Sequence, residues 1–334
     1  MNTKDQSVKI TVLMCVFNAE QWLEECIQSI LCQCYRNFEF IIINDGSTDN
    51  SLKILKKFAV EDSRIKIFTK SNTGLTSSLN YGIERATGSW IARIDADDIS
   101  TKHRLREQLK ETYKCGNVVL VGSGLTFIDA SGANLNSYIY PNQKARLRRR
   151  ITSGKAFFPH SSAFINTQAL RSIGGYREAF KRAQDLDLWL RLIEVGDVAC
   201  ISEPLVKIRR HANQLSSVNF GVDQVIYSHI ALTSYYLRTW SEIDPAQIQH
   251  NKLFDAFYDF VKNELRPAIN ELQTVQQIER NIKNNAHFKI DYLVKIKLFV
   301  IQSYLKLKRK LEIKPRSKDI AIKWVRQQKV NNGI

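Results

Sequence analysis

The chain has 334 residues, enough for one large domain with an appendage or for two domains. Its hydrophobic content of 44% is ordinary for a globular protein, and no uninterrupted apolar run is long enough to span a bilayer. The net charge of +16 predicts an anionic partner: nucleotide phosphates, an acidic membrane surface or nucleic acid. The N-terminus lacks the features of a signal peptide. The six cysteines form no CxxC pair, which argues against a zinc ribbon and favours reduced thiols in a cytosolic protein.

The first part of the chain alternates between strand and helix patterns. Apolar runs at residues 8–17, 38–43 and 65–69 predict buried strands. Helical spacing of apolar residues predicts helices between and after these strands, at residues 20–32, 51–60 and 75–86. This alternation indicates a parallel, doubly wound α/β sheet, in which the carboxyl ends of the strands meet at one edge.

A fourth strand ends in an acidic cluster. Residues 89–94 are apolar and rich in β-formers, and Asp95, Asp97 and Asp98 follow at once. Carboxylates this close repel one another unless a cation lies between them, and hard oxygen ligands favour Mg²⁺ or Mn²⁺. The alternative is a solvated acidic turn that caps the helix beginning near Thr101.

The strand ends expected at this edge form a candidate nucleotide site. They carry Phe17 and Asn18, residues 45–47, residues 72–74 and the acidic cluster. Backbone N–H groups and a metal suit the phosphates of a nucleotide, while an aspartate suits its base or ribose.

The next part of the chain continues the α/β pattern. We expect a helix at 101–114, a strand and returning strand at 117–128 and 136–140, and further strands at 160–166 and 198–208. Residues 144–150 are a basic run, interpreted as a solvated helix face or as a phosphate contact. An amphipathic helix begins at Gln184 and ends near Gly196, with Asp185 in its first turn, where the helix dipole favours an ionised carboxylate.

The character of the chain changes near residue 219. Residues 220–240, 245–266 and 269–311 have helical patterns, and 290–310 form a basic amphipathic segment. That segment either packs on the body with a solvated basic face or attaches to an anionic membrane surface. We therefore divide the chain into an α/β domain at 1–218, with a nucleotide-sugar half at about 1–115 and an acceptor half at about 116–218, and a basic helical region at 219–334.

The ordered motifs resemble those of the family 2 glycosyltransferases, inverting enzymes of the GT-A fold that build bacterial cell-surface polysaccharide and lipopolysaccharide. The resemblance covers about residues 8–217. The motifs that carry it are VFN at 16–18, NDGSTD at 44–49, NTG at 72–74, DADD at 95–98, GGY at 174–176, QDLDL at 184–188 and RH at 210–211.

The resemblance assigns roles to residues of these motifs. Asp185 corresponds to the catalytic base, and Asp98, Asp97 and His211 to the metal site. The nucleotide-sugar-binding residues that it implies are Phe17, Asn18, Glu20, Asp45, Asn72, Gly74, Asp95 and Asp97. Phe17 and Asp45 would contact the base. Asp187 and His160 are expected to be structural, and His211 is as compatible with a structural role as with a metal contact.

The expected reaction is direct displacement. A divalent Mg²⁺ or Mn²⁺ neutralises the leaving nucleoside diphosphate, and one carboxylate deprotonates the acceptor hydroxyl on the opposite face, which inverts the anomeric centre. At family level the donor is a UDP-sugar and the acceptor a glycan or lipid-linked molecule. We expect a cytoplasmic protein that binds no nucleic acid, and membrane attachment through the basic segment would place it on the inner face of the membrane.

Two other functions fit parts of the sequence. A nucleotidyltransferase that makes nucleotide sugars would share the sheet and the acidic site, but residues 16–20 are not the Gly-rich, basic phosphate loop that it requires. A non-enzymatic membrane- or RNA-binding protein would use the basic C-terminal helices, which carry no aromatic RNA-binding signature.

Overall fold

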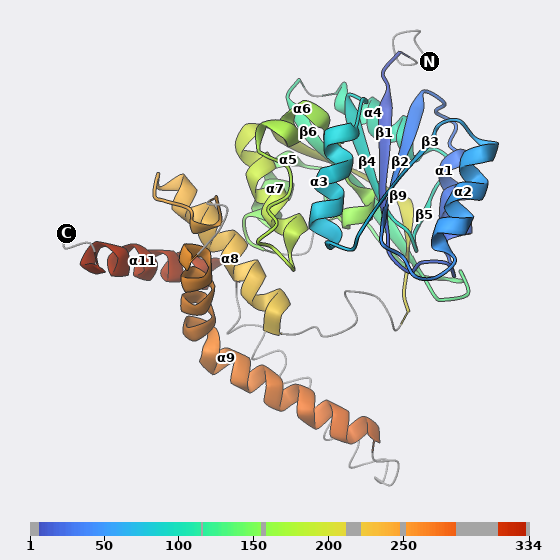
Figure 1. The fold of residues 1–334 in the computed structure, drawn as a ribbon. Coiled ribbons are helices and arrows are strands. Elements are labelled where there is room, and N and C mark those ends of the chain that lie inside the picture. The colour runs from blue at the N-terminus through green and yellow to red at the C-terminus, as the bar shows by residue number, and fades with distance from the viewer. Residues whose placement is uncertain are drawn as a thin grey trace. The chain divides into compact units, whose positions relative to one another are not determined.

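The computed structural model describes residues 7–114, 116–154, 158–211, 222–247, 252–284 and 313–331. The chain divides into two compact units, Met1–Ser217 and Val218–Ile334. The first is an α/β unit built on one mixed sheet, and the second is helical (Figure 1).

The first four strands are parallel, and their order places three of their ends beside one another. These strands are β1 (Ile10–Val16), β2 (Phe38–Asp45), β3 (Ile65–Lys70) and β4 (Trp90–Asp95), arranged as β3-β2-β1-β4. In this register Val16 pairs with Asn44, and Cys15 pairs with Asp95. The chain segments that follow β1, β2 and β4 therefore leave the sheet at the same edge, as predicted.

The sheet continues beyond β4 with mixed pairing. Here β8 (Phe164–Asn166) runs antiparallel to β4 and to β6 (Val118–Ile128), whereas β9 (Asp197–Arg209) runs parallel to β6. Two short strands complete it: β5 (Ile99–Ser100) pairs with β9, and β7 (Asn134–Tyr138) pairs with β6. Because β5 follows directly after Asp98, the acidic segment is a turn held between two strands.

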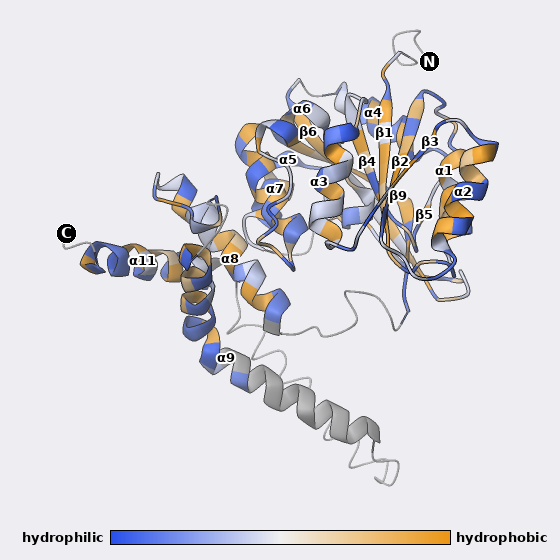
Figure 2. Cartoon of the chain, viewed as in Figure 1, coloured by the Kyte–Doolittle hydropathy of each residue, from blue (hydrophilic) through white to orange (hydrophobic). Residues whose placement is uncertain are grey.

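Helices cover both faces of the sheet (Figure 1). They are α1 (Leu23–Leu31), α2 (Ser51–Glu61), α3 (Leu75–Arg85), α4 (Arg104–Thr112), α5 (Lys144–Ile151), α6 (Thr167–Ser172) and α7 (Gln184–Val195). Every residue of β2 is buried, and the apolar interior of the sheet is visible in Figure 2. On one face, alternate residues of β1 such as Val12 and Met14 join a core with Leu23 of α1 and Leu105 of α4. This two-sided burial explains the continuous apolar runs in the sequence.

The opposite face of the sheet receives α3 at very close range. A Cβ atom at Gly82 would lie 2.3 Å from Cδ1 of Leu13, which is buried, so a larger residue would force Leu13 or the helix to move. The start of α3 follows Gly74, whose φ of 91° is in the left-handed region. The loop before α3 lies against the end of β2, because the N–H groups of Thr73 and Gly74 donate hydrogen bonds to Asp45.

Two predicted boundaries in this unit differ from the structure. The strand expected at 160–166 begins only at Phe164, because η2 (His160–Ser162) is a 3-10 turn in which the Ser162 hydroxyl donates to the carbonyl of Pro159 over 2.9 Å. The sequence also lacked a signal for the two-residue strand β5, whose pairing with Lys207 and Val206 of β9 is entirely non-local.

The second unit contains α8 (Val222–Thr239), η3 (Pro245–Gln247), α9 (Lys252–Asn284) and α11 (Ile313–Asn331). The break expected at residues 267–268 is wrong: α9 continues through Pro267. The ring of Trp324 on α11 packs against Phe257 and Phe260 of α9, with centroid distances of 4.9 and 5.2 Å. The basic segment at 290–310, for which we considered membrane attachment, lies outside the described residues. None of the described helices combines the length and apolar composition needed to cross a bilayer.

Candidate active site

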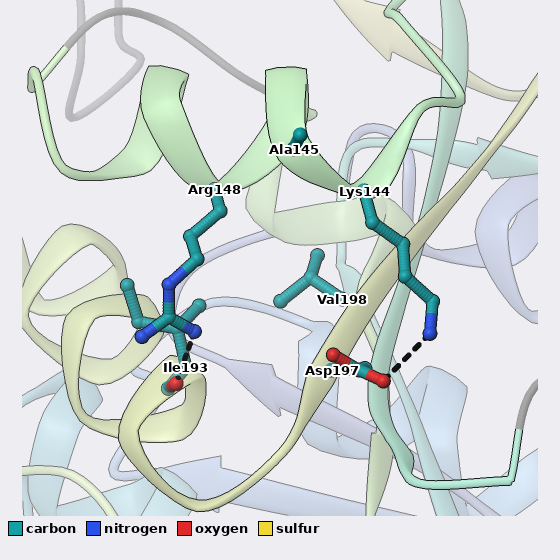
Figure 3. Close-up of a pocket in the computed structure, with 6 residues that line it drawn as sticks. All are labelled: Lys144, Ala145, Arg148, Ile193, Asp197 and Val198. Atoms are coloured by element: carbon teal, nitrogen blue, oxygen red, sulfur yellow. Dashed lines mark hydrogen bonds and ion pairs between the residues drawn. The ribbon is translucent and has the colours of Figure 1, made fainter.

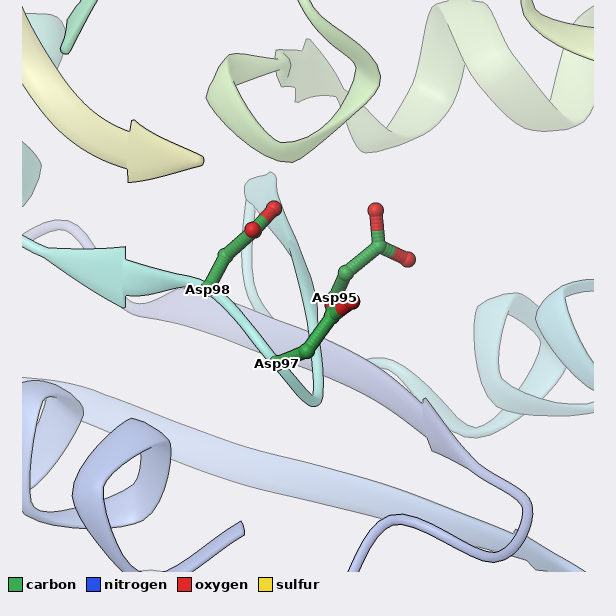
Figure 4. A group of neighbouring side chains, drawn as sticks. All are labelled: Asp95, Asp97 and Asp98. Carbon is green, nitrogen blue, oxygen red and sulfur yellow. The ribbon is translucent and has the colours of Figure 1, made fainter. Parts of the chain in front are cut away.

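The three carboxylates of the acidic cluster project from the turn that joins β4 to β5 (Figure 4). One carboxylate oxygen each from Asp95, Asp97 and Asp98 can be chosen so that all lie within 4.8 Å of one another. The three carboxylates differ in exposure, because Asp98 is 2% exposed whereas the side chains of Asp95 and Asp97 are 40% and 25% exposed. The turn therefore gathers oxygen donors at one place, with Asp98 at its base.

Each carboxylate of the turn is held by a different partner. The guanidinium of Arg93 binds both oxygens of Asp95. The backbone N–H of Arg209 donates to Oδ1 of Asp98 over 3.0 Å. Nε2 of His211 lies 2.9 Å from Oδ2 of Asp97. The cluster is therefore built by strand β4 together with the end of β9 and the residues after it.

The electrostatics of the turn favour a bound cation. Burial raises the pKa of Asp98, and the negative charges of Asp97 and Asp95 raise it further. Burial and Asp95 likewise raise the pKa of Asp97, against the opposing effect of His211. A divalent cation would relieve this repulsion, and carboxylate oxygens are the donors that Mg²⁺ and Mn²⁺ prefer. The donor set therefore fits the predicted metal.

His211 belongs to the site, although its role as a ligand stays a prediction. Its ring packs against Trp22 with a centroid distance of 4.1 Å and an interplanar angle of 40°, and the side chain is 10% exposed. The Nδ1 atom is buried without a hydrogen-bond partner among the described residues. The ring is thus held at the acidic turn with Nε2 directed at Asp97.

Arg209 joins three segments around the turn. Its Nε donates to the carbonyl of Asp97 over 3.0 Å, and Nη1 donates to the carbonyls of Asp129 and Ala130 over 3.2 and 3.3 Å. Its Nη2 pairs with Glu25 of α1. The β6–β7 turn, the acidic turn and α1 therefore share one buried guanidinium, a role that sequence reasoning missed.

The ends of β1 and β2 form the neighbouring part of the edge. Phe17 directly follows β1 and is 51% exposed, so its ring is accessible for stacking on a base. Asp45, at the end of β2, is 4% exposed and accepts hydrogen bonds from the N–H groups of Thr73 and Gly74 over 3.0 and 2.9 Å. Burial alone would raise the pKa of Asp45, but hydrogen bonds from Lys70 and Thr73 outweigh it and lower that pKa. Asp45 therefore fixes the loop before α3.

Asn18 and Glu20 connect this edge to the loop that follows β2. Oδ1 of Asn18 accepts from the N–H of Thr48 over 2.8 Å, and Oε2 of Glu20 accepts from the N–H of Asn50 over 2.9 Å. Asn72 approaches the same loop, because its backbone nitrogen would lie 2.8 Å from a Cβ at Gly46. The structure brings these predicted residues together, with Asn18 and Glu20 engaged in loop-to-loop contacts.

Asp185 lies in the first turn of α7, far from the acidic turn in sequence. The charge of Asp95 in that turn nevertheless affects the pKa of Asp185. Burial raises the pKa of its carboxyl group. The positive charge of Arg93 lowers this pKa, and the negative charge of Asp95 raises it. Among the described residues its carboxylate accepts a local hydrogen bond from the N–H of Leu186 over 2.8 Å. A partly exposed carboxylate whose hydrogen bond among the described residues is local is suited to accept a proton.

The neighbouring Asp187 is structural, as predicted. It is 0% exposed and forms ion pairs with Arg177 and Arg191. His160, also expected to be structural, lies with Nε2 2.5 Å from the hydroxyl of Tyr176. Burial lowers the pKa of His160, so this ring stays neutral. Helix α7 therefore buries Asp187 between two guanidinium groups and leaves Asp185, in its first turn, partly exposed.

The basic run at 144–150 forms α5, beside a cavity of about 230 Å³ (Figure 3). Lys144 pairs with Asp197 over 2.6 Å, and Nη1 of Arg148 donates to the carbonyl of Ile193 over 2.6 Å. Both partners lie at the C-terminal end of α7 and the start of β9, the opposite ends from Asp185 and Arg209. The cavity is thus separate from the acidic turn.

The fold is that of solved glycosyltransferases. The crystal structure of residues 1–349 of S. aureus TarS in complex with UDP-GlcNAc matches with a TM-score of 0.57 at 14% identity, covering 96% of this chain and 92% of that chain. The mannosyltransferase PcManGT from Pyrobaculum calidifontis, in complex with GDP-Man and Mn²⁺, matches with a TM-score of 0.53 at 15% identity, covering 96% and 88%. The α/β unit therefore has the GT-A fold.

Comparison with related sequences identifies the family of glycosyltransferases to which the chain belongs. Residues 11–174 match the model of glycosyl transferase family 2. The chain is 35% identical over 225 residues to the Bacillus subtilis (strain 168) protein named as glycosyltransferase EpsE, covering 65% of this chain and 80% of the relative. It is 33% identical over 233 residues to the O-antigen biosynthesis glycosyltransferase WbnJ of Escherichia coli, covering 69% and 87%. The chain belongs to glycosyltransferase family 2 and is a glycosyltransferase.

Proposed function

We propose that this enzyme transfers a sugar from a nucleoside-diphosphate donor, with UDP as the nucleotide, to a hydroxyl group of a glycan or lipid-linked acceptor. The process it serves is bacterial cell-surface polysaccharide synthesis, which is supported by the relative named for O-antigen biosynthesis. The observation that carries the proposal is the acidic turn, where carboxylate oxygens of Asp95, Asp97 and Asp98 converge at the end of β4.

In this proposal the edge formed by β1, β2 and β4 binds the donor. The exposed ring of Phe17 stacks on the base, and the loops that Asn18, Glu20, Asp45, Asn72 and Gly74 hold together shape its pocket. Asp95 and Asp97 orient the ribose and the diphosphate. Asp98 and Asp97, with His211 beside them, hold Mg²⁺ or Mn²⁺. When bound, the cation supplies positive charge for the leaving diphosphate.

Asp185 is the general base of the proposed reaction. It accepts the proton of the acceptor hydroxyl as the oxygen attacks the anomeric carbon, and the bond to the diphosphate breaks on the opposite face. A single base with direct displacement inverts the configuration. The burial that raises the pKa of Asp185 also strengthens its basicity toward the hydroxyl.

The net charge of +16 favours electrostatic attraction to an anionic membrane surface. We propose that the enzyme acts at the inner, cytoplasmic face of the membrane that carries its acceptor. No nucleic acid is part of this proposal.

The test is a donor screen with the full chain. UDP-, GDP- and dTDP-sugars are incubated with and without Mn²⁺, and release of the nucleoside diphosphate is measured. We expect metal-dependent release of UDP from a UDP-sugar and its loss in Asp98→Asn. Pyrophosphate release from a sugar phosphate and a nucleoside triphosphate would instead identify a nucleotidyltransferase. Full activity of Asp98→Asn would contradict the proposed metal site.

A further inference from the structure

Ser161 lies at the centre of the acidic turn, although it comes from the acceptor half of the unit. It is 1% exposed and belongs to the 3-10 turn η2. Its Oγ atom lies 2.9 Å from Oδ2 of Asp95 and 2.5 Å from Oδ2 of Asp98. The same oxygen accepts hydrogen bonds from the backbone N–H of Asp95 over 3.1 Å and from Nη1 of Arg93 over 3.0 Å. One hydroxyl therefore contacts two of the three carboxylates.

The single proton of this hydroxyl has two candidate acceptors and can satisfy only one at a time. Asp95 already receives both arms of the Arg93 guanidinium, so each of its oxygens has a charged donor. For Asp98, the hydrogen bonds among the described residues are those from Ser161 and from the backbone N–H of Arg209. The proton is therefore needed at Oδ2 of Asp98, while the N–H groups of Asp95 and Arg93 occupy the lone pairs of the hydroxyl.

We propose that Ser161 is a positioning residue for the metal ligand Asp98. Its hydroxyl fixes Oδ2 while the Arg209 N–H fixes Oδ1, so the carboxylate has one orientation and keeps a lone pair on each oxygen for the cation. This inference rests on the proposed metal-dependent function. It assigns to Ser161 no contact with the substrate or with the metal itself.

The turn that carries Ser161 is anchored independently of the carboxylates. The Ser162 hydroxyl donates to the carbonyl of Pro159 over 2.9 Å and accepts from the N–H of Ser123 over 3.3 Å. Nε2 of Gln108 donates to the carbonyl of Ser162 over 2.6 Å. Ser162 is as buried as Ser161, at 0% exposure, but its hydroxyl bonds with Pro159 and Ser123 involve no carboxylate. The chain thus offers a matched control in the adjacent residue.

The experiment measures metal binding rather than activity. Mn²⁺ is titrated into the full-length protein with saturating UDP, or with GDP if the wild type prefers it, and free Mn²⁺ is followed by electron paramagnetic resonance. Loss of a group that orients a ligand weakens metal affinity by about 10- to 100-fold. We expect a loss in this range for Ser161→Ala and an affinity within about twofold of wild type for Ser162→Ala. Thermal unfolding of each variant reports whether it is folded.

Ser161→Cys provides a second test if the alanine variant does not fold. A thiol is a poor donor of similar size, so we expect the same direction of change in Mn²⁺ affinity. Unchanged affinity in the folded variants at position 161, or an equal loss in Ser162→Ala, would overturn the assignment while leaving the proposed function intact. Absence of Mn²⁺ binding by the wild type with either nucleotide would instead remove the metal site, and the inference with it.

Discussion

The backbone N–H of Arg209 donates a hydrogen bond of 3.0 Å to Oδ1 of Asp98, across 111 positions of sequence. The side chain of Arg209 binds the carbonyl of Asp97 in the same turn. The shape of the acidic turn therefore depends on the end of β9 as much as on β4. A change in either half of the α/β unit can therefore alter the acidic turn that we propose as the metal site.

The base assignment predicts a selective loss of rate. We expect Asp185→Asn to lower the rate of sugar transfer by about 10²- to 10⁴-fold, the usual contribution of a positioned general base. Binding of Mn²⁺ and UDP should stay unchanged, because the acidic turn is intact. Transfer kinetics and a parallel Mn²⁺ titration measure the two effects. Retention of full transfer by this variant would show that another group removes the proton.

The environment of Asp185 predicts the pH dependence of transfer. Burial raises the pKa of its carboxyl group above the ordinary value of 3.8. A raised carboxyl pKa means that the basic form is lost at a higher pH as the solution is acidified. We therefore expect the acid limb of the pH–rate profile to lie above pH 3.8. Nucleotide binding measured over the same range separates this titration from effects on the donor. A rate that stays constant down to pH 3.8 argues against Asp185 as the base.

For the same substitution at Asp187, we expect a loss of stability. Asp187 is fully buried between Arg177 and Arg191, so Asp187→Asn removes the negative charge that forms ion pairs with both guanidinium groups. Removing one partner from a buried ion pair costs about 3–5 kcal/mol. We expect urea unfolding to show a loss of this size, whereas Asp185→Asn should unfold at close to the wild-type concentration. Equal stability of the two variants would contradict the structural role of Asp187.

The helical C-terminal unit should lose stability in mild acid. Burial, together with the charge of Arg316, lowers the pKa of His229 to about 3, and its Nδ1 lies 2.9 Å from the Ser317 hydroxyl. Between that value and the ordinary pKa of 6.5, the unfolded chain binds a proton that the folded unit excludes. The free energy of unfolding should therefore fall as the pH drops below 6.5, by up to about 1.4 kcal/mol per pH unit.

Proteolysis in urea at a series of pH values, with cleavage in α8 mapped by mass spectrometry, measures this dependence. His229→Gln should flatten it, because the titrating group is gone. His103→Gln is the matched control, because that exposed histidine lies in the other unit. A pH profile unchanged by His229→Gln would show that other groups govern the stability of α8.

The sequence alone located the acidic turn and most of its edge. Continuous apolar runs require strands buried on both faces, and parallel strands place their carboxyl ends together, so Phe17, Asp45 and Asp98 could be assigned to one edge before any coordinates. Helical periodicity also separated Asp185 from Asp187, since residues two positions apart on a helix point in different directions. Local patterns predict these features because the type of each element, and the residues at its end, depend on the spacing of apolar residues along the chain.

Only the tertiary structure decided which groups hold the carboxylates in place. Ser161 lies 63 residues from Asp98 in a segment expected to be a strand, and Arg209 directly follows the strand expected at 198–208, so neither had a local signal for its role. The short strand β5 exists because β9 offers free backbone groups beside it. Hydrogen bonds between distant segments depend on which strands pair in the sheet. The periodicity of residues along the chain does not predict that pairing.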